Sequence, residues 1–453
     1  MACVAPAPES FPFSVETLVV GAGACGMVAA LSARDAGQEV MVLERDPLPS
    51  GSTALSAGLI PAAGTRFQKE AGIEDGAALF AADIQRKARG ENDQGLVELL
   101  AGGAAEAVEW LADRHGLPFS LVSDFDYPGH SRRRMHGLPG RSGRELVDRL
   151  RGACEAAGID IVCDATVTTL YAQGDRIMGV GISRPDGSED RLGCGRLILA
   201  CNGFGGSRAR VARHMPEIEG ALWFGHDGNR GEALDWGESL GAATCHLGAY
   251  QGHGNVAHPH GILITWAVIT EGGVQVNRDG DRFWNEAQGY SEAARAVLAQ
   301  PGGEAFAIFD ARIAGIARQF ADFREAEAQG AIKTGQTPEA LAEALGLPGG
   351  RLARTLAAIP VGGTDAFGRR FPDTRLSPPY CGVKVTGALF HTQGGLVIDG
   401  QARVVKTDGT PFPNLYAAGG AACGVSGAGD AGYLSGNGLL SAVALGRIAG
   451  RAG

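Results

Sequence analysis

Short apolar runs flank a longer helical pattern near the start of the chain. Residues 16–20 are an apolar run typical of a buried strand, and residues 39–43 are a second run of the same kind. Between them, residues 24–36 place apolar side chains at the spacing of an amphipathic helix, which Gly37 ends. This order of elements predicts a β-α-β unit.

The turn between the first strand and the helix carries three spaced glycines, Gly21, Gly23 and Gly26. In this G-x-G-x-x-G spacing the first glycine makes the tight turn, the second lets a pyrophosphate approach the backbone, and the third lets the helix pack close to the strand. Glu44 ends the second strand, where an acidic side chain binds ribose hydroxyls. Glycine spacing alone is weak evidence in a chain with 71 glycines. Together with the strand, the helix and Glu44, it predicts a dinucleotide-binding site.

Further helices and strands follow this unit. Helical patterns are predicted for residues 76–87, 95–115, 145–157 and 229–241, and strands for residues 160–163, 166–171, 176–182 and 196–201. Residues 130–144 are strongly basic, which predicts either a solvated loop or an anion site built from arginines. From about residue 250 to 390 the pattern is mainly helical, with helices at 287–300 and 337–359 and few strands between them.

The last segment returns to the first pattern, with strands at 395–399 and 414–418 and a helix at 437–450. A C-terminal strand and helix that complete the N-terminal sheet imply a discontinuous domain with an insertion. We therefore predict a first domain in two parts, residues 1–258 and 392–453, and an inserted α+β domain over residues 259–391.

Composition narrows the functional class. The 453 residues, 45% of them apolar, suit a compact α/β protein of two domains, and the net charge of −10 argues against nucleic acid as a partner. We expect no integral membrane segment, because no apolar run reaches the roughly 18 residues that a spanning helix needs. The nine cysteines show no Cys-x-x-Cys spacing, so we expect reduced thiols, a cytoplasmic location, and neither a disulfide framework nor a metal site.

Several separated motifs resemble one family, the FAD-dependent fumarate reductases and ketosteroid dehydrogenases. The matching stretches are residues 21–26 with Glu44, 51–53 with Ser56 and Gly58, 199–206, 279–286, 391–396 and 414–419. The resemblance implies an α/β fold, with a Rossmann-like FAD-binding domain and an inserted α+β capping domain. The FAD-binding residues that it implies are Gly21, Gly23, Ala24, Cys25, Gly26, Glu44, Arg45, Gly51, Ser52, Thr53, Ser56, Gly58, Val167, Cys201, Asn202, Gly203, Gly419, Gly420, Asn437 and Leu439.

Two departures from the family pattern concern the chemistry. Members that attach FAD covalently have a histidine just after the Ser-x-Gly stretch, whereas Leu59, Ile60 and Pro61 follow Gly58 here, so we expect FAD to bind non-covalently. The dicarboxylate reductases of the family also have two arginines, one delivering a proton and one binding a substrate carboxylate. Both positions are tyrosine in this chain, Tyr290 and Tyr433.

The tyrosines resemble those of the ketosteroid dehydrogenases, which implies α,β-dehydrogenation of a ketone or reduction of an enone. In this interpretation Tyr290 is the acid/base and Tyr433 binds the carbonyl, because a phenol donates a hydrogen bond and a tyrosinate removes a proton. The Gly436 N–H is a second candidate oxyanion donor and Ser435 a candidate proton relay. His391 occupies the position of a substrate-binding histidine. The second such histidine corresponds loosely to His253 or His258.

Two alternatives remain open at this point. The first is a fumarate reductase-like ene-reductase or dehydrogenase for a carboxylate substrate, using His391 and one arginine of residues 132–134. The second is a non-catalytic flavoprotein subunit that only transfers electrons. In each case the electron acceptor is unknown, because the chain carries neither a ferredoxin-like cysteine cluster nor a haem motif.

Overall fold

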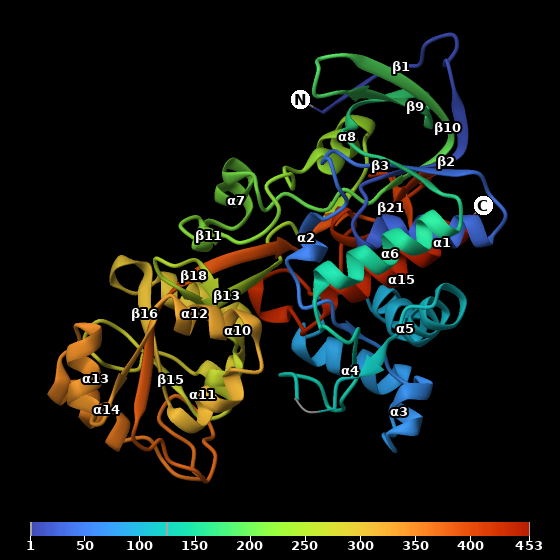
Figure 1. Ribbon diagram of the computed structural model, residues 1–453. Helices are drawn as coiled ribbons and strands as arrows, with labels where there is room; N and C mark the ends of the chain where they lie inside the picture. The colour runs from blue at the N-terminus through green and yellow to red at the C-terminus, as the bar shows by residue number, and fades with distance from the viewer. Residues whose placement is uncertain (1, 124–125, 453) are drawn as a thin grey trace. The chain divides into compact units, whose positions relative to one another are not determined.

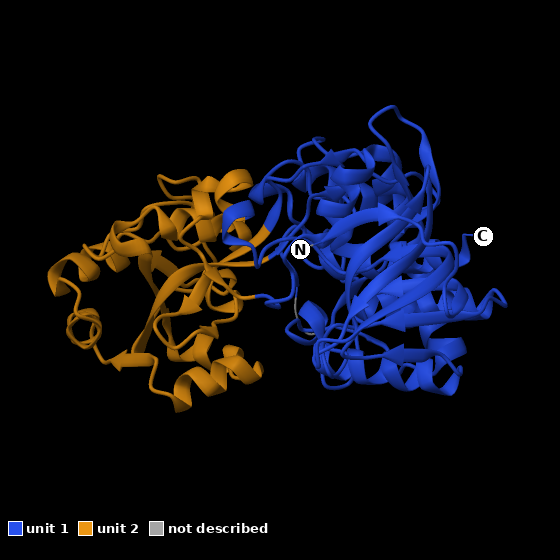
Figure 2. Cartoon of the chain, turned by 90° about the horizontal axis from the view of Figure 1, so that it is seen from above, with its two compact units in different colours: residues 1–210, 225–250, 391–453 blue, residues 211–224, 251–390 orange. Residues whose placement is uncertain are grey.

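The computed structural model describes residues 2–123 and 126–452. Figure 2 shows two compact units. Unit 1 consists of Met1–Arg210, Gly225–Tyr250 and His391–Gly453, and unit 2 consists of Val211–Phe224 and Gln251–Phe390. Both units contain a β-sheet with helices, so the predicted mixed α/β fold is confirmed.

The boundaries of the units differ from the predicted domains at three places, one of which is His391, a residue of unit 1 that the prediction assigns to the inserted domain. Residues 251–258 and 211–224 belong to unit 2, whereas the prediction assigns both segments to the FAD-binding domain. The reason is strand pairing. β13 (Tyr250–Ala257) is a strand of the sheet of unit 2, and β11 (Leu222–Trp223) pairs in parallel with β18 (Tyr380–Thr392) of the same sheet.

The centre of unit 1 is a parallel sheet in the order β21-β10-β2-β3-β7. These strands are β2 (Ser14–Val20), β3 (Val40–Leu43), β7 (Asp160–Val162), β10 (Glu189–Leu199) and β21 (Pro411–Ala417). The last four residues of β2 are all buried, which is typical of a parallel strand covered on both faces. The C-terminal β21 pairs with β10 in this sheet, so strands from both ends of the chain form one sheet.

An antiparallel extension continues from β10. It consists of β8 (Thr166–Gln173), β9 (Arg176–Ser183) and the first half of β10, and a tight turn joins β8 to β9. β1 (Cys3–Pro6) pairs in parallel with β8, although the sequence predicts no strand there. The remaining strands of unit 1 are β4 (Ile60–Pro61), β5 (Ser120–Leu121), β6 (Met135–Gly137), β12 (Thr244–Cys245), β19 (Gly395–Leu396) and β20 (Arg403–Val405).

Helices α1 (Ala24–Asp35) and α15 (Asn437–Arg451) pack directly against each other in unit 1 (Figure 1). A Cβ atom on Gly446 would lie 2.7 Å from the Cys25 carbonyl oxygen, and one on Gly450 would lie 2.3 Å from that of Ala29, so only glycine permits this approach. Residues 24–33 are all buried, so α1 is a core helix and not the predicted amphipathic one. The other helices are α2 (Gly51–Ala54), α3 (Arg66–Glu70), α4 (Ala77–Lys87), α5 (Gln94–His115), α6 (Gly143–Ala156) and α8 (Glu232–Leu240).

Unit 2 is built on a sheet in the order β14-β13-β18-β16-β15, with β11 and β17 also paired to β18. The strands not yet given are β14 (Ile262–Leu263), β15 (Val274–Val276), β16 (Glu304–Asp310) and β17 (Ile332–Gly335). The expectation of few strands in this segment is therefore wrong. Every residue of β16 is buried, and the long β18 alternates buried positions with half-buried lysine and threonine, which obscures a strand pattern in sequence.

The helices of unit 2 surround an apolar core that includes Phe309, Phe323 and Leu352. They are α9 (Ala267–Thr270), α10 (Tyr290–Leu298), α11 (Ala311–Ala317), α12 (Ala321–Ala328), α13 (Pro338–Leu345) and α14 (Gly349–Ala357), while α7 (Arg208–His214) begins in unit 1 and ends in unit 2. One helix is predicted over 337–359, but Gly346 with φ +72° ends α13 and Pro348 precedes α14.

A buried ion pair fixes the segment that leads into α10. The fully buried Glu286 carboxylate accepts hydrogen bonds from Arg282 at 2.5 Å and from the Gln275 backbone N–H at 3.0 Å, and it pairs with Arg369 at 3.0 Å. Removing one partner of a buried pair leaves an uncompensated charge.

We predict that Glu286→Ala lowers the free energy of unfolding by about 3–5 kcal/mol, because Arg282 and Arg369 then lose their buried counter-ion. Glu327→Ala is the matched control, since Glu327 pairs with the half-exposed Arg318 in the same unit and should cost at most about 1 kcal/mol. Urea denaturation of both variants measures the difference. Equal losses in the two variants would contradict a structural role for the buried pair.

Candidate active site

The glycines of the first turn leave an open cradle at the N-terminus of α1. Gly21 has φ +104°, and a Cβ atom there would lie 2.6 Å from the Ala200 carbonyl oxygen. A Cβ atom on Gly26 would lie 1.8 Å from the Gly21 oxygen, so this close contact of helix and turn requires glycine. Gly23 is the N-cap, and a Cβ atom there would meet only the Thr53 hydroxyl at 3.5 Å. Such an N-terminus suits a pyrophosphate.

Polar groups surround this cradle. The Glu44 carboxylate, just beyond β3, accepts a hydrogen bond of 2.7 Å from the Ala22 N–H and is almost fully buried. From α2, the Ser52 hydroxyl accepts hydrogen bonds from the side-chain amides of Asn202 at 3.1 Å and Asn229 at 2.8 Å. Thr53 accepts one from the Ala24 N–H at 3.1 Å. The structure therefore brings together predicted residues from three separate segments.

The segment around Gly419 and Gly420 completes the same region. A Cβ atom on Gly419 would lie 3.1 Å from the Cys25 sulfur, and one on Gly420 would lie 2.0 Å from the Asn202 side-chain oxygen. Burial raises the pKa of the neighbouring Cys201 thiol to about 12, so this group stays protonated. The cysteine of α1 and Cys201 thus act as small apolar groups.

Other predicted cofactor residues have structural partners of their own. The Arg45 guanidinium pairs with Glu232 at 2.8 Å and donates to the Gly228 carbonyl. Ser56 donates to the Thr53 carbonyl, and Gly58 packs where a Cβ atom would lie 2.7 Å from the Ser142 oxygen. Gly51 begins α2, Gly203 packs against Thr392, Val167 is buried in β8, and Leu439 lies in the first turn of α15.

These residues fit FAD. The cradle of α1 has space for a pyrophosphate, and Glu44 is fixed at the end of β3. At the start of α15 the buried Asn437 side-chain oxygen has no hydrogen-bond partner among the described residues. An unpaired buried acceptor of this kind is expected where a ligand supplies the missing donor.

Tyr433 and His391 meet at the N-terminus of α15. Their rings lie 5.5 Å apart, edge to face, and Tyr433 is almost fully buried. Burial raises the pKa of Tyr433, and hydrogen bonds from the backbone amides of Gly438 and Gly436 to the phenol oxygen offset this in part. Tyr433 is therefore a neutral hydrogen-bond donor whose oxygen faces the positive end of a helix.

A chain of hydrogen bonds fixes the orientation of His391. Asn437 donates to the Ser426 hydroxyl at 3.1 Å, Ser426 donates to the Gln393 side-chain oxygen at 2.7 Å, and the Gln393 amide lies 3.0 Å from His391 Nδ1. The Thr392 carbonyl oxygen lies farther from Nδ1, at 3.3 Å, so we assign the closer Gln393 amide as the donor to Nδ1, which places the imidazole proton on Nε2. Desolvation lowers the pKa of His391 to about 4, so the ring is neutral at neutral pH.

The predicted roles of Gly436 and Ser435 remain predictions. The Gly436 N–H, predicted as a second oxyanion donor, also interacts with the Tyr433 phenol oxygen, and Gly436 has a left-handed φ of +86°. Ser435, predicted as a relay, is almost fully buried, and its carbonyl accepts a hydrogen bond of 2.9 Å from His130. Gln393 and Ser426, which orient His391, are missed from sequence. Gln393 lies in residues 391–396, one of the stretches that resemble the family, but nothing in the sequence indicates that it contacts Ser426.

Tyr290 belongs to unit 2, where it is the first residue of α10. Its ring stacks on that of His253 at 5.1 Å and meets the edge of Trp266 at 6.4 Å. Desolvation lowers the pKa of His253 to about 3. Of the two candidate histidines, His253 is thus the one beside Tyr290, whereas the partly exposed His258 pairs with Glu304 at 3.2 Å.

The arginines of residues 132–134 bind acceptors of unit 1 itself. The fully buried Arg134 pairs with Asp75 at 2.8 Å and Asp83 at 2.6 Å, while Arg133 pairs with Asp126 and Arg132 donates to the Glu74 carbonyl. Of the two interpretations of this segment, the solvated loop does not hold for Arg134, and the anions that Arg134 binds are two carboxylates of the protein itself. Its guanidinium is neutralised by two carboxylates.

Known proteins with similar sequences are flavoproteins. A family model described as an FAD binding domain matches residues 16–439. The probable fumarate reductase Ifc3 of Shewanella frigidimarina is 32% identical over 447 residues, which are 96% of this chain and 74% of that protein. The 4-oxocyclohexanecarboxylate 2-dehydrogenase of Sinomonas cyclohexanicum is 25% identical, over 93% of this chain and 92% of that protein.

Solved structures of flavoproteins have the same fold as this chain. The open conformation of a flavocytochrome c3 fumarate reductase matches with a TM-score of 0.83 at 30% identity, covering 98% of this chain and 78% of that one. The 3-ketosteroid-Δ4-(5α)-dehydrogenase of Rhodococcus jostii has the same fold, with a TM-score of 0.78 at 24% identity over 98% and 97% of the two chains.

Among the described residues, no helix has the length and apolar character needed to cross a membrane. The glycine turn at the N-terminus of α1, the buried Glu44 and the family match are all typical of a flavin enzyme. The chain belongs to the FAD binding domain family that includes the fumarate reductase flavoproteins, and it is an FAD-dependent oxidoreductase acting on CH–CH groups.

Proposed function

We propose that the protein reduces a C=C bond conjugated to an oxo group, or forms that bond in the reverse direction. The observation that carries this proposal is the pair of neutral donors at the start of α15, Tyr433 and His391. Because the relatives include fumarate reductases, an α,β-unsaturated acid is the first candidate substrate. Gly21, Gly23, Glu44 and Asn437 would hold FAD, which supplies hydride exchange when bound.

FAD binding is proposed to be non-covalent. Buried aliphatic residues, Leu59 and Ile60, follow Gly58, and neither offers a nucleophile for attachment to the flavin. Acid precipitation tests this proposal, because a covalently attached flavin stays with the precipitated protein and a non-covalent one is released.

Tyr433 is proposed to donate its hydroxyl proton in a hydrogen bond to the substrate oxo oxygen. The backbone amides of Gly436 and Gly438 donate to the same phenol oxygen, which polarises the O–H bond and strengthens its donation. His391 Nε2–H is the second donor. Donors that are already oriented stabilise the negative charge that develops on the oxo oxygen without reorganising.

Tyr290 is proposed to exchange a proton with the α-carbon, as donor in reduction and as acceptor in dehydrogenation. The neutral His253 stacked on its ring adds no positive charge. This tyrosine therefore acts through its own hydroxyl, in the place where the dicarboxylate reductases have an arginine.

A ketone or enone substrate is the second candidate, favoured by the pairing of Arg134, the buried arginine of the candidate carboxylate-binding segment, with two carboxylates of the protein. Arg134 is neutralised by Asp75 and Asp83, so it offers no charge to a substrate carboxylate. The relative named 4-oxocyclohexanecarboxylate 2-dehydrogenase acts on a molecule with both an oxo and a carboxylate group. Substrates of that mixed kind suit both candidates.

A substrate panel tests the proposal. The holoenzyme is reduced anaerobically, and flavin reoxidation is followed with fumarate, acrylate, 2-cyclohexenone and an unsaturated oxo acid. The oxidised enzyme is assayed in parallel with the saturated compounds and an artificial electron acceptor. Turnover of acids alone supports the first candidate, and turnover of ketones alone supports the second. No turnover with any compound would contradict both and favour an electron-transfer subunit.

We predict that Tyr433→Phe and Tyr290→Phe each keep bound FAD but lower kcat by roughly 10²–10³, the typical cost of removing one such donor or acid/base. Tyr416→Phe is the matched control, because Tyr416 is as buried as Tyr433 but lies in β21. Flavin absorbance and steady-state rates are measured on the same samples. Rates near that of the control in both variants would refute the assignment.

We predict that the pH profile of kcat/KM shows no inflection from His391 between about pH 5 and 8, because its pKa is lowered to about 4. Gln393→Glu places a carboxylate beside Nδ1, which raises the His391 pKa and introduces an inflection in that range. Gln393→Leu removes the amide without adding charge and should leave the profile flat. Profiles of the same shape for the Glu and Leu variants would show that Gln393 does not set the state of His391.

A further inference from the structure

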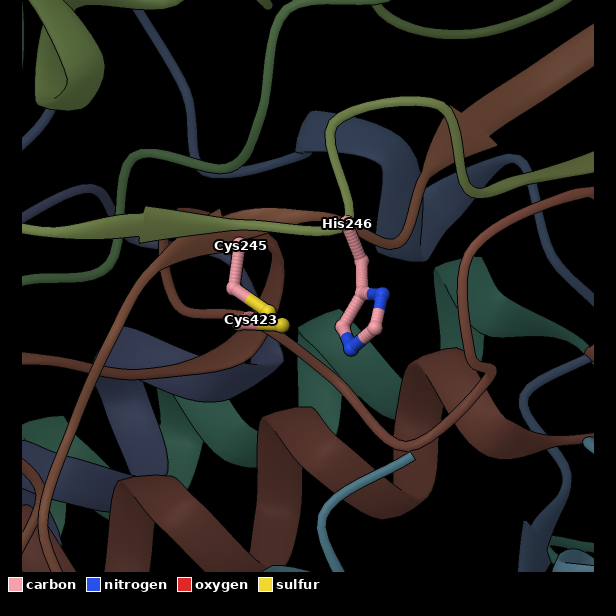
Figure 3. Close-up of side chains that lie close together, drawn as sticks. All are labelled: Cys245, His246 and Cys423. Atoms are coloured by element: carbon pink, nitrogen blue, oxygen red, sulfur yellow. The ribbon is translucent and has the colours of Figure 1, made fainter. Parts of the chain in front are cut away.

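Two thiols and an imidazole converge in unit 1, in a cluster formed by Cys245, His246 and Cys423 (Figure 3). Cys245 ends β12, His246 follows it, and Cys423 comes shortly after the turn at Gly419. Their ligand atoms, the two sulfurs and one imidazole nitrogen, all lie within 4.8 Å of one another. Neither the FAD-binding residues nor the Tyr433–His391 pair includes any of them.

The segments that carry the two cysteines both form backbone contacts with one short strand, β19. Cys245 pairs with Gly395 across the antiparallel β12–β19 ladder, and the Cys423 N–H donates to the Leu396 carbonyl at 2.8 Å. His246 has φ +53°, a left-handed conformation that few non-glycine residues adopt. A Cβ atom on Gly394 would lie 2.0 Å from the His246 oxygen, so a glycine is required beside it. The three ligands are thus positioned before any ion binds.

The charge around the cluster favours a cation. The carboxylate of Asp93 acts on both sulfurs and adds negative potential. Cys423 is buried, whereas Cys245 and His246 are half-buried, so the cluster has a buried sulfur and a side open to entry.

We propose that Cys245, His246 and Cys423 bind a soft divalent metal ion, with Zn²⁺ as the fitting case. Zinc bonds to sulfur at about 2.3 Å and to nitrogen at about 2.0–2.1 Å in a tetrahedron, which places neighbouring ligand atoms about 3.4–3.8 Å apart. The ligand atoms of the cluster, which lie within 4.8 Å of one another, need only small movements to reach these distances. Two thiolates balance the charge of the ion, their protons pass to solvent, and water occupies the fourth position.

Metal binding would also fix the segment next to the substrate-binding network. The Gly424 N–H, one residue beyond Cys423, donates to the Gln393 carbonyl at 2.8 Å. An ion that ties Cys423 to β12 therefore restrains the backbone that carries Gln393. Because the ion binds the folded chain in preference to the unfolded one, it should raise the melting temperature.

The test uses the full-length holoenzyme, reduced, freed of metal with a chelator and desalted without oxygen. Zn²⁺ binding is measured by competition with a chromophoric chelator, and Co²⁺ is added separately to detect thiolate-to-cobalt charge transfer. The variants are Cys245→Ser, Cys423→Ser and His246→Asn, the last because asparagine tolerates the left-handed conformation. Cys381→Ser is the matched control, a buried cysteine of unit 2.

The wild type and the control should bind one Zn²⁺ and show the cobalt–thiolate band. Each cysteine variant should weaken the band, His246→Asn should change the visible cobalt spectrum, and all three variants should weaken zinc affinity by roughly 100-fold or more. Zinc affinity in the wild type equal to that of the ligand variants would overturn the proposal. So would a disulfide between Cys245 and Cys423 that forms in air and persists in the presence of excess Zn²⁺, since it would assign the pair to thiol oxidation. If the cysteine variants fail to fold, the cobalt spectra of the wild type and His246→Asn decide.

Discussion

The close packing of α1 against α15 is the constraint on which the candidate site depends. Gly446 and Gly450 let α15 approach the backbone of Cys25 and Ala29 to a distance that any side chain would prevent. α1 comes from the first β-α-β unit and α15 from the end of the chain, so this contact joins two segments more than four hundred residues apart. The Ser32 hydroxyl adds a hydrogen bond of 2.9 Å to the Arg447 carbonyl.

Two helix N-termini then supply the electrostatics of unit 1. The N-terminus of α1 lies behind glycines and suits an anionic pyrophosphate, whereas that of α15 faces the phenol oxygen of Tyr433. Positive potential at the second site comes from backbone dipoles, because His391 is neutral and Arg134 is bound to Asp75 and Asp83. In the proposed function, such a site polarises an oxo group through donors and dipoles that are already oriented.

Local patterns predict much of unit 1. The β-α-β unit, its glycine turn and Glu44 are recognisable because their spacing is set by short-range geometry. Unit 2 is harder, since β18 mixes glycine, lysine and threonine with its apolar residues and reads as irregular. Contacts between distant residues are not visible in sequence at all. The pairing of Glu286 with Arg369, the chain from Asn437 to His391, and the meeting of Cys245 with Cys423 all arise only from the fold.

Infrared difference spectroscopy of a bound carbonyl tests the central claim most directly. A ¹³C-labelled, unreactive oxo acid or ketone is bound to the oxidised holoenzyme, and its C=O stretching frequency is compared with that in water. We predict a lower frequency in the wild type, because Tyr433 and His391 polarise the bond, and a partial return towards the solution value in Tyr433→Phe. An unchanged frequency in the wild type, or the same shift in Tyr433→Phe, would contradict the account.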